Sequence, residues 1–333
     1  MRLGVVDVGS NTARLVIAER GGEMPLPVYS SKRRLRLAER AAADGRLGRD
    51  AVDDLAKAVG KAKKDAADRG VSEPFMFATA AVREAPNRQQ VLAEVHARTG
   101  VHLHVMPGVR EAELAFTAAR HWMGWRAGPM VLLDIGGGSL EIAVGRGRMP
   151  DYAVSLPLGA GRLTREHLNQ DVLPDPAALR LVRRRIRHEL RDVAARIQWE
   201  GPRTAVATSR TFHQLARLCA AGLDNTAPKN APGRLTRRGL KAAVGTLAGL
   251  TAPERAQLPG ISPARAHQSL AGALIAHTTM RLLHLDQAVL CPWAVREGVL
   301  LTALNGNGST QLRPTAPLPQ PAAEPAALPA SVG

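Results

Sequence analysis

The residues best suited to chemistry lie in two short segments that pair an aspartate with a tight, glycine-containing turn. The first reads Asp7-Val-Gly-Ser-Asn-Thr12, and the second reads Asp134-Ile-Gly-Gly-Gly-Ser139. Backbone N–H groups in such a turn can bind phosphate oxygens, and a nearby carboxylate can hold Mg²⁺, which prefers oxygen ligands. The two segments therefore predict chemistry on phosphate groups.

The two segments are copies of one pattern. A shift of 127 positions (134 minus 7) places Asp134 on Asp7 and Ser139 on Thr12. In each copy an apolar run, a turn and a second apolar run predict a β-hairpin. A single Asp-Gly turn usually only closes a hairpin, but two matching copies favour a functional role. One hairpin at the start of each half predicts two similar domains facing one cleft.

The elements that must position these turns alternate between strands and helices. Asp175-Pro176 is a helix start, with a capping side chain before a proline at the first helical position. Apolar periodicity predicts helices at 50–67, 88–98, 176–198, 211–221, 235–249 and 263–283. Short apolar runs predict strands at 75–78, 101–106, 203–207 and 287–291. This alternation places the chain in the α/β class.

Composition indicates a globular, cytoplasmic protein. Hydrophobic residues make up 45% of the 333 residues but aromatic residues only 3%, so Leu, Val, Ile and Ala must form the core. We expect neither a signal peptide nor a membrane span. Cys219 and Cys291 form no disulfide framework or metal cluster, and we expect both to be reduced. Residues 305–333 are rich in Pro and Ala, which predicts a disordered tail without a part in the chemistry.

The net charge of +16 indicates attraction to anions such as nucleic acid, an acidic membrane or a polyanionic substrate, although genome bias is an alternative explanation. In the run Lys32-Arg33-Arg34-Leu-Arg36, alternation would place Arg34 and Arg36 on one strand face. They could extend a phosphate track, or simply lie at a solvated strand edge. The arginines of the 176–198 helix are by default a solvated face, with guidance of a long polyanion as the alternative.

Five ordered motifs resemble the exopolyphosphatase/guanosine pentaphosphate phosphatase family, a branch of the actin-like superfamily, over roughly residues 1–304. They are Asp7 to Leu15, Ala78 to Ala85, Pro107 to Ala112, Asp134 to Glu141 and Leu156 to Thr164. The resemblance implies two RNase H-like (actin-like) α/β domains, 1–124 and 125–304, around a central cleft. It implies no extra C-terminal helical domain, and a last helix near 295–304 that packs on the first domain.

The resemblance also implies site residues. Glu111 would orient and deprotonate the attacking water, and Glu141 would act with it as a second catalytic residue. Asp134 and Glu141 would hold Mg²⁺, with Mn²⁺ as the alternative. Substrate phosphates would bind Asp7, Ser10, Asn11, Thr12, Arg14, Arg83, Gly137, Gly138 and Ser139. Without the resemblance, we would interpret Glu111 as an exposed charge at a helix start.

The sequence departs from the family pattern at several positions. Arg110 replaces the first of two acidic residues, and Pro107 stands where serine is common. Leu140 replaces a threonine, which removes a hydroxyl that could position water. Ser209-Arg210 replaces a glycine pair in the region that contacts nucleotide in actin-like kinases, so nucleotide specificity is open. The retained Glu111 predicts that activity is kept.

The predicted reaction is metal-dependent hydrolysis of the terminal phosphate of inorganic polyphosphate by an activated water. The first alternative is hydrolysis of guanosine pentaphosphate, which would link the protein to the stringent response. A second is a non-catalytic sensor that binds polyphosphate or guanosine tetra- or pentaphosphate. A nucleic-acid binder, motivated by charge, and an actin-like kinase are less favoured, and no membrane partner is expected. Dimers are common in the family.

Overall fold

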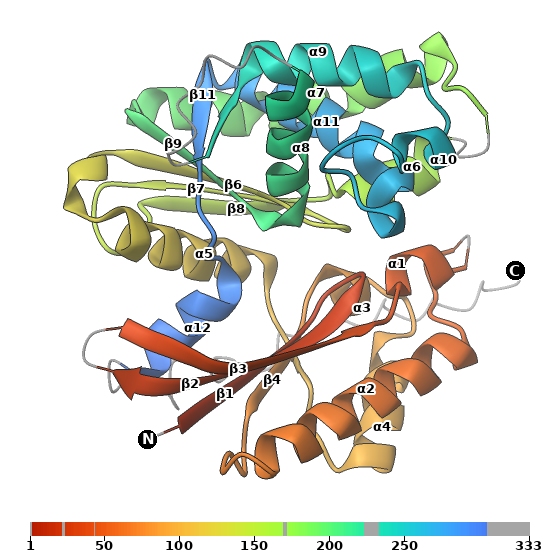
Figure 1. Cartoon of the computed structure of the whole chain (residues 1–333), viewed down its shortest axis with the longest axis vertical. Coiled ribbons are helices and arrows are strands. Elements are labelled where there is room, and N and C mark those ends of the chain that lie inside the picture. The colour runs from red at the N-terminus through yellow and green to blue at the C-terminus, as the bar shows by residue number, and fades with distance from the viewer. Residues whose placement is uncertain (1, 22–23, 43, 169–171, 223–232, 305–333) are drawn as a thin grey trace, which may run out of the picture.

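The computed structural model describes residues 2–21, 24–42, 44–168, 172–222 and 233–304. They form two α/β halves, each built on one mixed sheet (Figure 1). The predicted tail at 305–333 lies outside the described residues. No helix in the described ranges is long and apolar enough to cross a membrane.

The first sheet has the strand order β3-β2-β1-β4-β5. Three antiparallel strands come first, β1 (Arg2–Val8), β2 (Thr12–Gly21) and β3 (Met24–Arg34), and two short parallel strands follow, β4 (Phe75–Ala78) and β5 (His104–Val105). Its outer face is covered by α2 (Arg49–Ala67) and α4 (Arg88–Thr99), whose apolar stripes join a core around Leu55 and Val91. The short helices α1 (Leu37–Arg40) and α3 (Ala80–Arg83) lie at the edge that faces the second half (Figure 1).

The second sheet has the order β10-β11-β9-β6-β7-β8. Its strands are β6 (Met130–Ile135), β7 (Leu140–Gly145), β8 (Tyr152–Leu156), β9 (Thr204–Thr208), β10 (Arg234–Thr236) and β11 (Gln287–Leu290). The helices on its outer side are α6 (Ala160–His167), α7 (Pro176–Glu200), α8 (Ser209–Gly222), α9 (Arg237–Ala248), α10 (Ala252–Arg255) and α11 (Ala266–Leu282). Leu270, Leu274 and their neighbours on α11 are fully buried in this larger core.

Two helices lie between the sheets and join the halves (Figure 1). They are α5 (Gly108–Met123), which packs on β6, β7 and β8, and α12 (Val295–Leu304), which packs on α5 and β1. A third core cluster includes Phe77 from the first sheet, Phe116 from α5 and Leu132 from the second sheet. The chain therefore crosses between the halves twice, before β6 and after β11. The expected return of the last helix to the first half is confirmed.

Both predicted hairpins are present. β1 pairs with β2 so that Asp7 lies opposite Arg14, and β6 pairs with β7 so that Asp134 lies opposite Glu141. The predicted helices are also present, with ends that differ by a few residues. The division into domains 1–124 and 125–304 stays a prediction.

One local prediction was wrong, and two were correct in the type of element but not in its extent. Only His104–Val105 of the predicted strand 101–106 pairs with β4. The predicted helix at 235–249 begins at Arg237, because Thr236 ends β10 and its hydroxyl accepts a hydrogen bond from the Gly239 N–H as the helix cap. Arg36 does not alternate with Arg34, because β3 ends at Arg34 and Arg36 adopts a left-handed conformation with φ of 55°.

Candidate functional site

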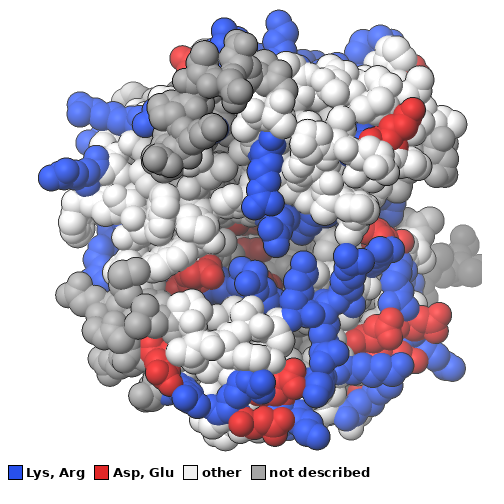
Figure 2. Space-filling view, in the orientation of Figure 1, with Lys and Arg blue, Asp and Glu red and all other residues white. Residues whose placement is uncertain are grey.

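The two glycine-containing turns meet at the interface between the halves. A Cβ placed on Gly137 would lie 2.7 Å from the Cβ of Ser10, and one on Gly138 would lie 2.7 Å from the Cβ of Ala80. Only glycine permits this approach. The predicted phosphate-binding residues Ser10, Gly137 and Gly138 are thus brought together from opposite halves. Figure 2 shows the hollow between the halves, with acidic side chains inside it and Lys and Arg around it.

Each hairpin contributes one aspartate to the hollow. Arg296 donates a hydrogen bond of 3.1 Å to Asp7, and Thr208 Oγ1 donates one of 2.7 Å to Asp134. Burial raises the pKa of both carboxyls above the usual value, while these two donors oppose the rise. The charge on Asp7 also raises the pKa of Asp134, so the two aspartates lie close enough to repel one another.

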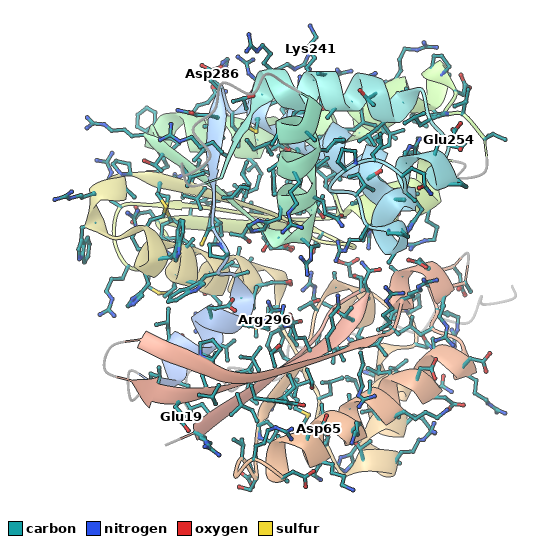
Figure 3. The ribbon with its side chains drawn as sticks, in the orientation of Figure 1. Glu19, Asp65, Lys241, Glu254, Asp286 and Arg296 are labelled. Atoms are coloured by element: carbon teal, nitrogen blue, oxygen red, sulfur yellow. The ribbon has the colours of Figure 1, made fainter. Side chains whose placement is uncertain are left out.

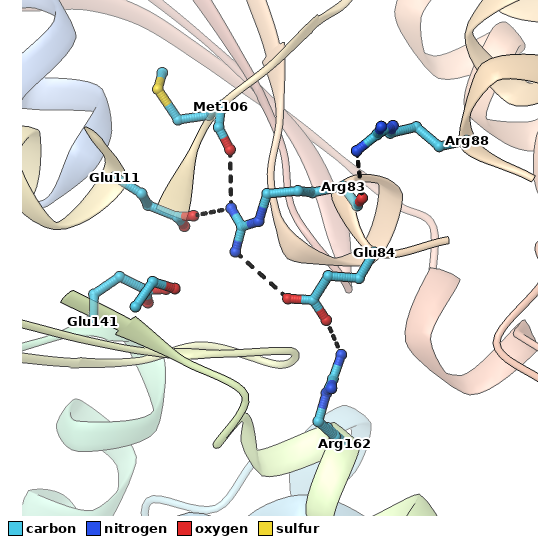
Figure 4. A network of polar contacts seen from close by, with 8 residues as sticks. Arg83, Glu84, Arg88, Met106, Glu111, Glu141 and Arg162 are labelled. Atoms are coloured by element: carbon cyan, nitrogen blue, oxygen red, sulfur yellow. Dashed lines mark hydrogen bonds and ion pairs between the residues drawn. The ribbon is translucent and has the colours of Figure 1, made fainter. Parts of the chain in front are cut away.

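Glu111 lies in the first turn of α5 and is held by one arginine. Arg83 Nη1 donates to Glu111 Oε2 at 2.9 Å and to the Met106 carbonyl oxygen at 2.9 Å (Figure 4). The Glu111 side chain is only 13% exposed. Burial raises its pKa to about 7, although Arg83 acts in the opposite direction. A carboxyl with this pKa is suited to accept a proton near neutral pH.

Glu141 approaches the same place from β7 (Figure 4). It is 2% exposed and accepts a hydrogen bond of 2.8 Å from Ser155 Oγ. Burial and then the charge of Glu111 raise its pKa well above the usual value, against hydrogen bonds from Ser139 and Ser155. A Cβ on Gly108 would lie 2.4 Å from the Ser155 Cβ, so glycine there lets α5 begin against β8. This contact brings the two glutamates together.

The remaining predicted residues line the same hollow on the side of the first turn. Arg14 Nε donates to Ser30 Oγ at 3.1 Å, and its pKa is lowered by burial and by the nearby Arg296. Asn11 and Thr12 line a pocket beside the turn. The structure therefore gathers the predicted residues around one hollow, and their individual roles remain predictions.

Sequence reasoning missed four side chains that hold this arrangement. Glu84 forms ion pairs with Arg83 at 3.6 Å and with Arg162 of the second half. Glu84 and Arg162 stand within recognised motifs, so their positions could have drawn attention. Arg296 and Thr208 belong to none of the five motifs, and only the fold brings them to the aspartates.

The carboxylates of the hollow could supply only some of the ligands that a metal ion needs. Among the described residues, no group of three or more His, Cys, Asp and Glu side chains is arranged to hold a metal ion. Mg²⁺ is usually held by one or two carboxylates together with water and substrate phosphate oxygens. The buried carboxylates Asp134 and Glu141 suit such a site, because a cation would offset their raised pKa values.

The departures from the family pattern have local explanations. Leu140 is fully buried in the core of the second half. Arg110 forms an ion pair of 2.9 Å with Glu113 on its own helix. Ser209 has φ of 74°, a left-handed conformation that favours glycine, and its hydroxyl is buried without a hydrogen-bond partner among the described residues. Ser209 therefore has a strained backbone at a position where the family pattern has glycine.

The comparisons with known proteins agree with this geometry. The model of the Ppx/GppA phosphatase family matches residues 15–306. The chain belongs to this family. As a member of this family the protein is a hydrolase, and its predicted two-domain actin-like fold is confirmed.

Relatives match along almost the whole chain. An uncharacterised protein of Streptomyces coelicolor is 57% identical over 307 residues, which cover 90% of each chain. Exopolyphosphatase 1 of Mycobacterium leprae is 45% identical over 308 residues, 92% of this chain and 90% of that one. The crystal structure of an exopolyphosphatase from Cytophaga hutchinsonii superimposes with a TM-score of 0.82 at 22% identity, covering 92% of this chain and 98% of the other. That likeness shows the shared fold.

Proposed function

We propose that this protein is an exopolyphosphatase, which hydrolyses the terminal phosphoanhydride bond of inorganic polyphosphate. The observation that carries the proposal is the position of Glu111: a buried carboxyl with a pKa of about 7, held by Arg83 and close to Glu141. It lies beside two turns whose backbone suits phosphate oxygens. The name of the Mycobacterium leprae relative, exopolyphosphatase 1, supports the same substrate.

In the proposed reaction Glu111 accepts a proton from a water molecule as the water oxygen attacks the terminal phosphorus. The bond from that phosphorus to the bridging oxygen breaks, orthophosphate leaves, and the bridging oxygen remains on the shortened chain. Arg83 is placed to offset charge on the phosphate oxygens, and the turn N–H groups orient them. Mg²⁺, held by Asp134 and Glu141, would supply positive charge to the phosphates.

Hydrolysis of guanosine pentaphosphate by the same groups is the second candidate, because the family description covers both Ppx and GppA. That activity would connect the protein with the stringent response. We further propose action in the cytoplasm, in keeping with two free cysteines, of which Cys291 is buried. A homodimer remains a proposal drawn from the family resemblance.

The test is orthophosphate release from long polyphosphate, tripolyphosphate and guanosine pentaphosphate, with Mg²⁺ and after its removal by a chelator. Glu111→Gln keeps the shape of the side chain but removes the base. Glu113→Gln, two positions along the same helix, is the matched control. Release by wild type and Glu113→Gln, lost in a folded Glu111→Gln, would support the proposal. No release from either polyphosphate would overturn it.

A further inference from the structure

A basic pocket opens beside the first turn, between the halves. Its volume is 430 Å³, and its wall includes six cationic side chains from both halves: Lys32, Arg34, Arg36, Arg210, Arg217 and Arg265. We call this hollow the basic pocket. Figure 2 shows Lys and Arg gathered along the junction of the two halves on this face of the molecule.

Most cations of the basic pocket form no ion pair with a described acidic side chain. Within the described residues only Arg36 has an ion pair, at 3.7 Å from Glu39. The pKa of Arg265 is lowered to about 10 by burial and by the neighbouring charge of Arg210. Burial and the same two arginines lower the pKa of Lys32. Because like charges this close repel one another, a bound polyanion would stabilise the pocket.

The basic pocket adjoins the first turn of the candidate active site. Asn11 and Thr12, which belong to the first turn, form part of its wall. Arg265 is also near enough to Asp134 for that carboxylate to raise its pKa. A linear phosphate chain with its end at the turns can therefore extend into the pocket.

The wall of the basic pocket carries much positive charge and few large apolar side chains. None of its lining residues is aromatic, and its larger apolar side chains are limited to Ile261. A nucleobase could stack here only on guanidinium planes, because the wall offers no aromatic ring. A wall of six separate cations instead matches the evenly spaced negative charges of a phosphate chain.

A second cationic hollow, lined by Arg46, Arg83 and Arg88, is the rival route for the chain. Two of its three arginines are already engaged. Arg83 pairs with Glu111, and Arg88 donates to the Arg83 carbonyl oxygen at 3.1 Å. The basic pocket thus offers more free positive charge.

We propose that the basic pocket binds the distal phosphates of a long polyphosphate, and that Arg210 and Arg217 determine preference for long phosphate chains over tripolyphosphate and guanosine pentaphosphate. The inference rests on the proposed function and names its substrate class. Both arginines are on α8, and Arg210 stands where the family resemblance leads one to expect a glycine. In this proposal Arg210, which departs from the family pattern, contacts the phosphate chain.

The test compares the double variant Arg210→Ala/Arg217→Ala with Arg184→Ala, an exposed arginine of α7 outside the pocket. We expect the double variant to lower kcat/KM for long polyphosphate about tenfold or more, mainly through KM, because two charge-assisted contacts to the distal phosphates are lost. Its kcat/KM for tripolyphosphate should fall much less. Arg184→Ala should resemble wild type on both substrates.

A binding measurement tests this inference independently of the hydrolysis reaction. Glu111→Gln, which cannot turn over substrate, should bind long polyphosphate more weakly and with less salt dependence once Arg210 and Arg217 are also replaced. Equal losses on long polyphosphate, tripolyphosphate and guanosine pentaphosphate would overturn the inference, as would an effect of Arg46→Ala in place of the double variant. If wild type releases no phosphate from polyphosphate, the proposed function fails instead.

Discussion

Arg296, in the last described helix, donates a hydrogen bond to Asp7, in the first strand, across 289 positions of sequence. Figure 3 shows Arg296 at the start of α12, between the two sheets. Its Nε is buried without a hydrogen-bond partner among the described residues and lies 3.9 Å from a carboxylate oxygen of Glu297. The guanidinium is therefore held mainly by its hydrogen bond to Asp7. The pair fixes α12 to the strand that carries the first turn.

Arg296→Ala should destabilise the protein, because it leaves the Asp7 carboxylate largely buried without its main cationic partner. Leaving one buried partner of a hydrogen bond unsatisfied costs about 1–3 kcal/mol, and more when that partner is charged. Urea unfolding measures the change, with Arg281→Ala, an exposed arginine at the end of α11, as the control. Equal stability of the two variants would contradict the structural role of Arg296.

The pH dependence of the reaction should report Glu111. A base must be ionised to accept a proton, so kcat/KM should rise with pH and level off above about 7, the pKa to which burial raises Glu111. Arg83 lowers that pKa, so Arg83→Gln should move the rise to higher pH. The pH profile of each protein, recorded on tripolyphosphate, measures the midpoint. A midpoint unmoved by Arg83→Gln would argue against Glu111 as the titrating group.

The contact between the two turns should tolerate no side chain larger than hydrogen. In Gly137→Ala the new Cβ would clash with Ser10 and push the halves apart. Because misplacement of reacting groups by about 1 Å can cost on the order of 100-fold in rate, activity should fall steeply. Gly147→Ala is the matched control, since its nearest neighbour, the Met149 carbonyl oxygen, is at an ordinary 3.8 Å. Phosphate release is measured for both variants, and equal rates for Gly137→Ala and Gly147→Ala would contradict the prediction.

Replacing Ser209 by glycine should stabilise the fold. The left-handed conformation costs a non-glycine residue about 1–2 kcal/mol, and the serine hydroxyl is buried without a partner in the described structure. The added flexibility of the unfolded glycine chain offsets part of the gain. Thermal and urea unfolding of Ser209→Gly should therefore show a modest increase in stability. Ser72→Gly, at an exposed position without positive φ, should show none.

The elements predicted best are those defined by short-range patterns. Both hairpins follow from an apolar run on each side of a turn, and α7 follows from the Asp175-Pro176 start and one apolar stripe. Helix and strand ends were less predictable, because they depend on single hydrogen bonds such as the one from Gly239 to Thr236.

Site residues could be predicted only where they lie within one of the five motifs. Glu111 and Glu141 stand in motifs, but their raised pKa values come from burial that no local pattern encodes. The hydrogen bond from Thr208 to Asp134 spans 74 positions and depends on β6 and β9 being neighbours in the sheet. Strand order depends on the whole chain, so the side-chain contacts that it creates could not be predicted from a short segment of sequence.

The position of α12 has a consequence for synthesis on the ribosome. Strands β6 to β11 and the helices around them can collapse into their own core once they have emerged, whereas β1 must wait for α12, the last described helix, before its packing is complete. The half that is translated first is therefore the half that is finished last. A chain cut short before Arg296 would carry a complete second sheet beside an unfinished first one.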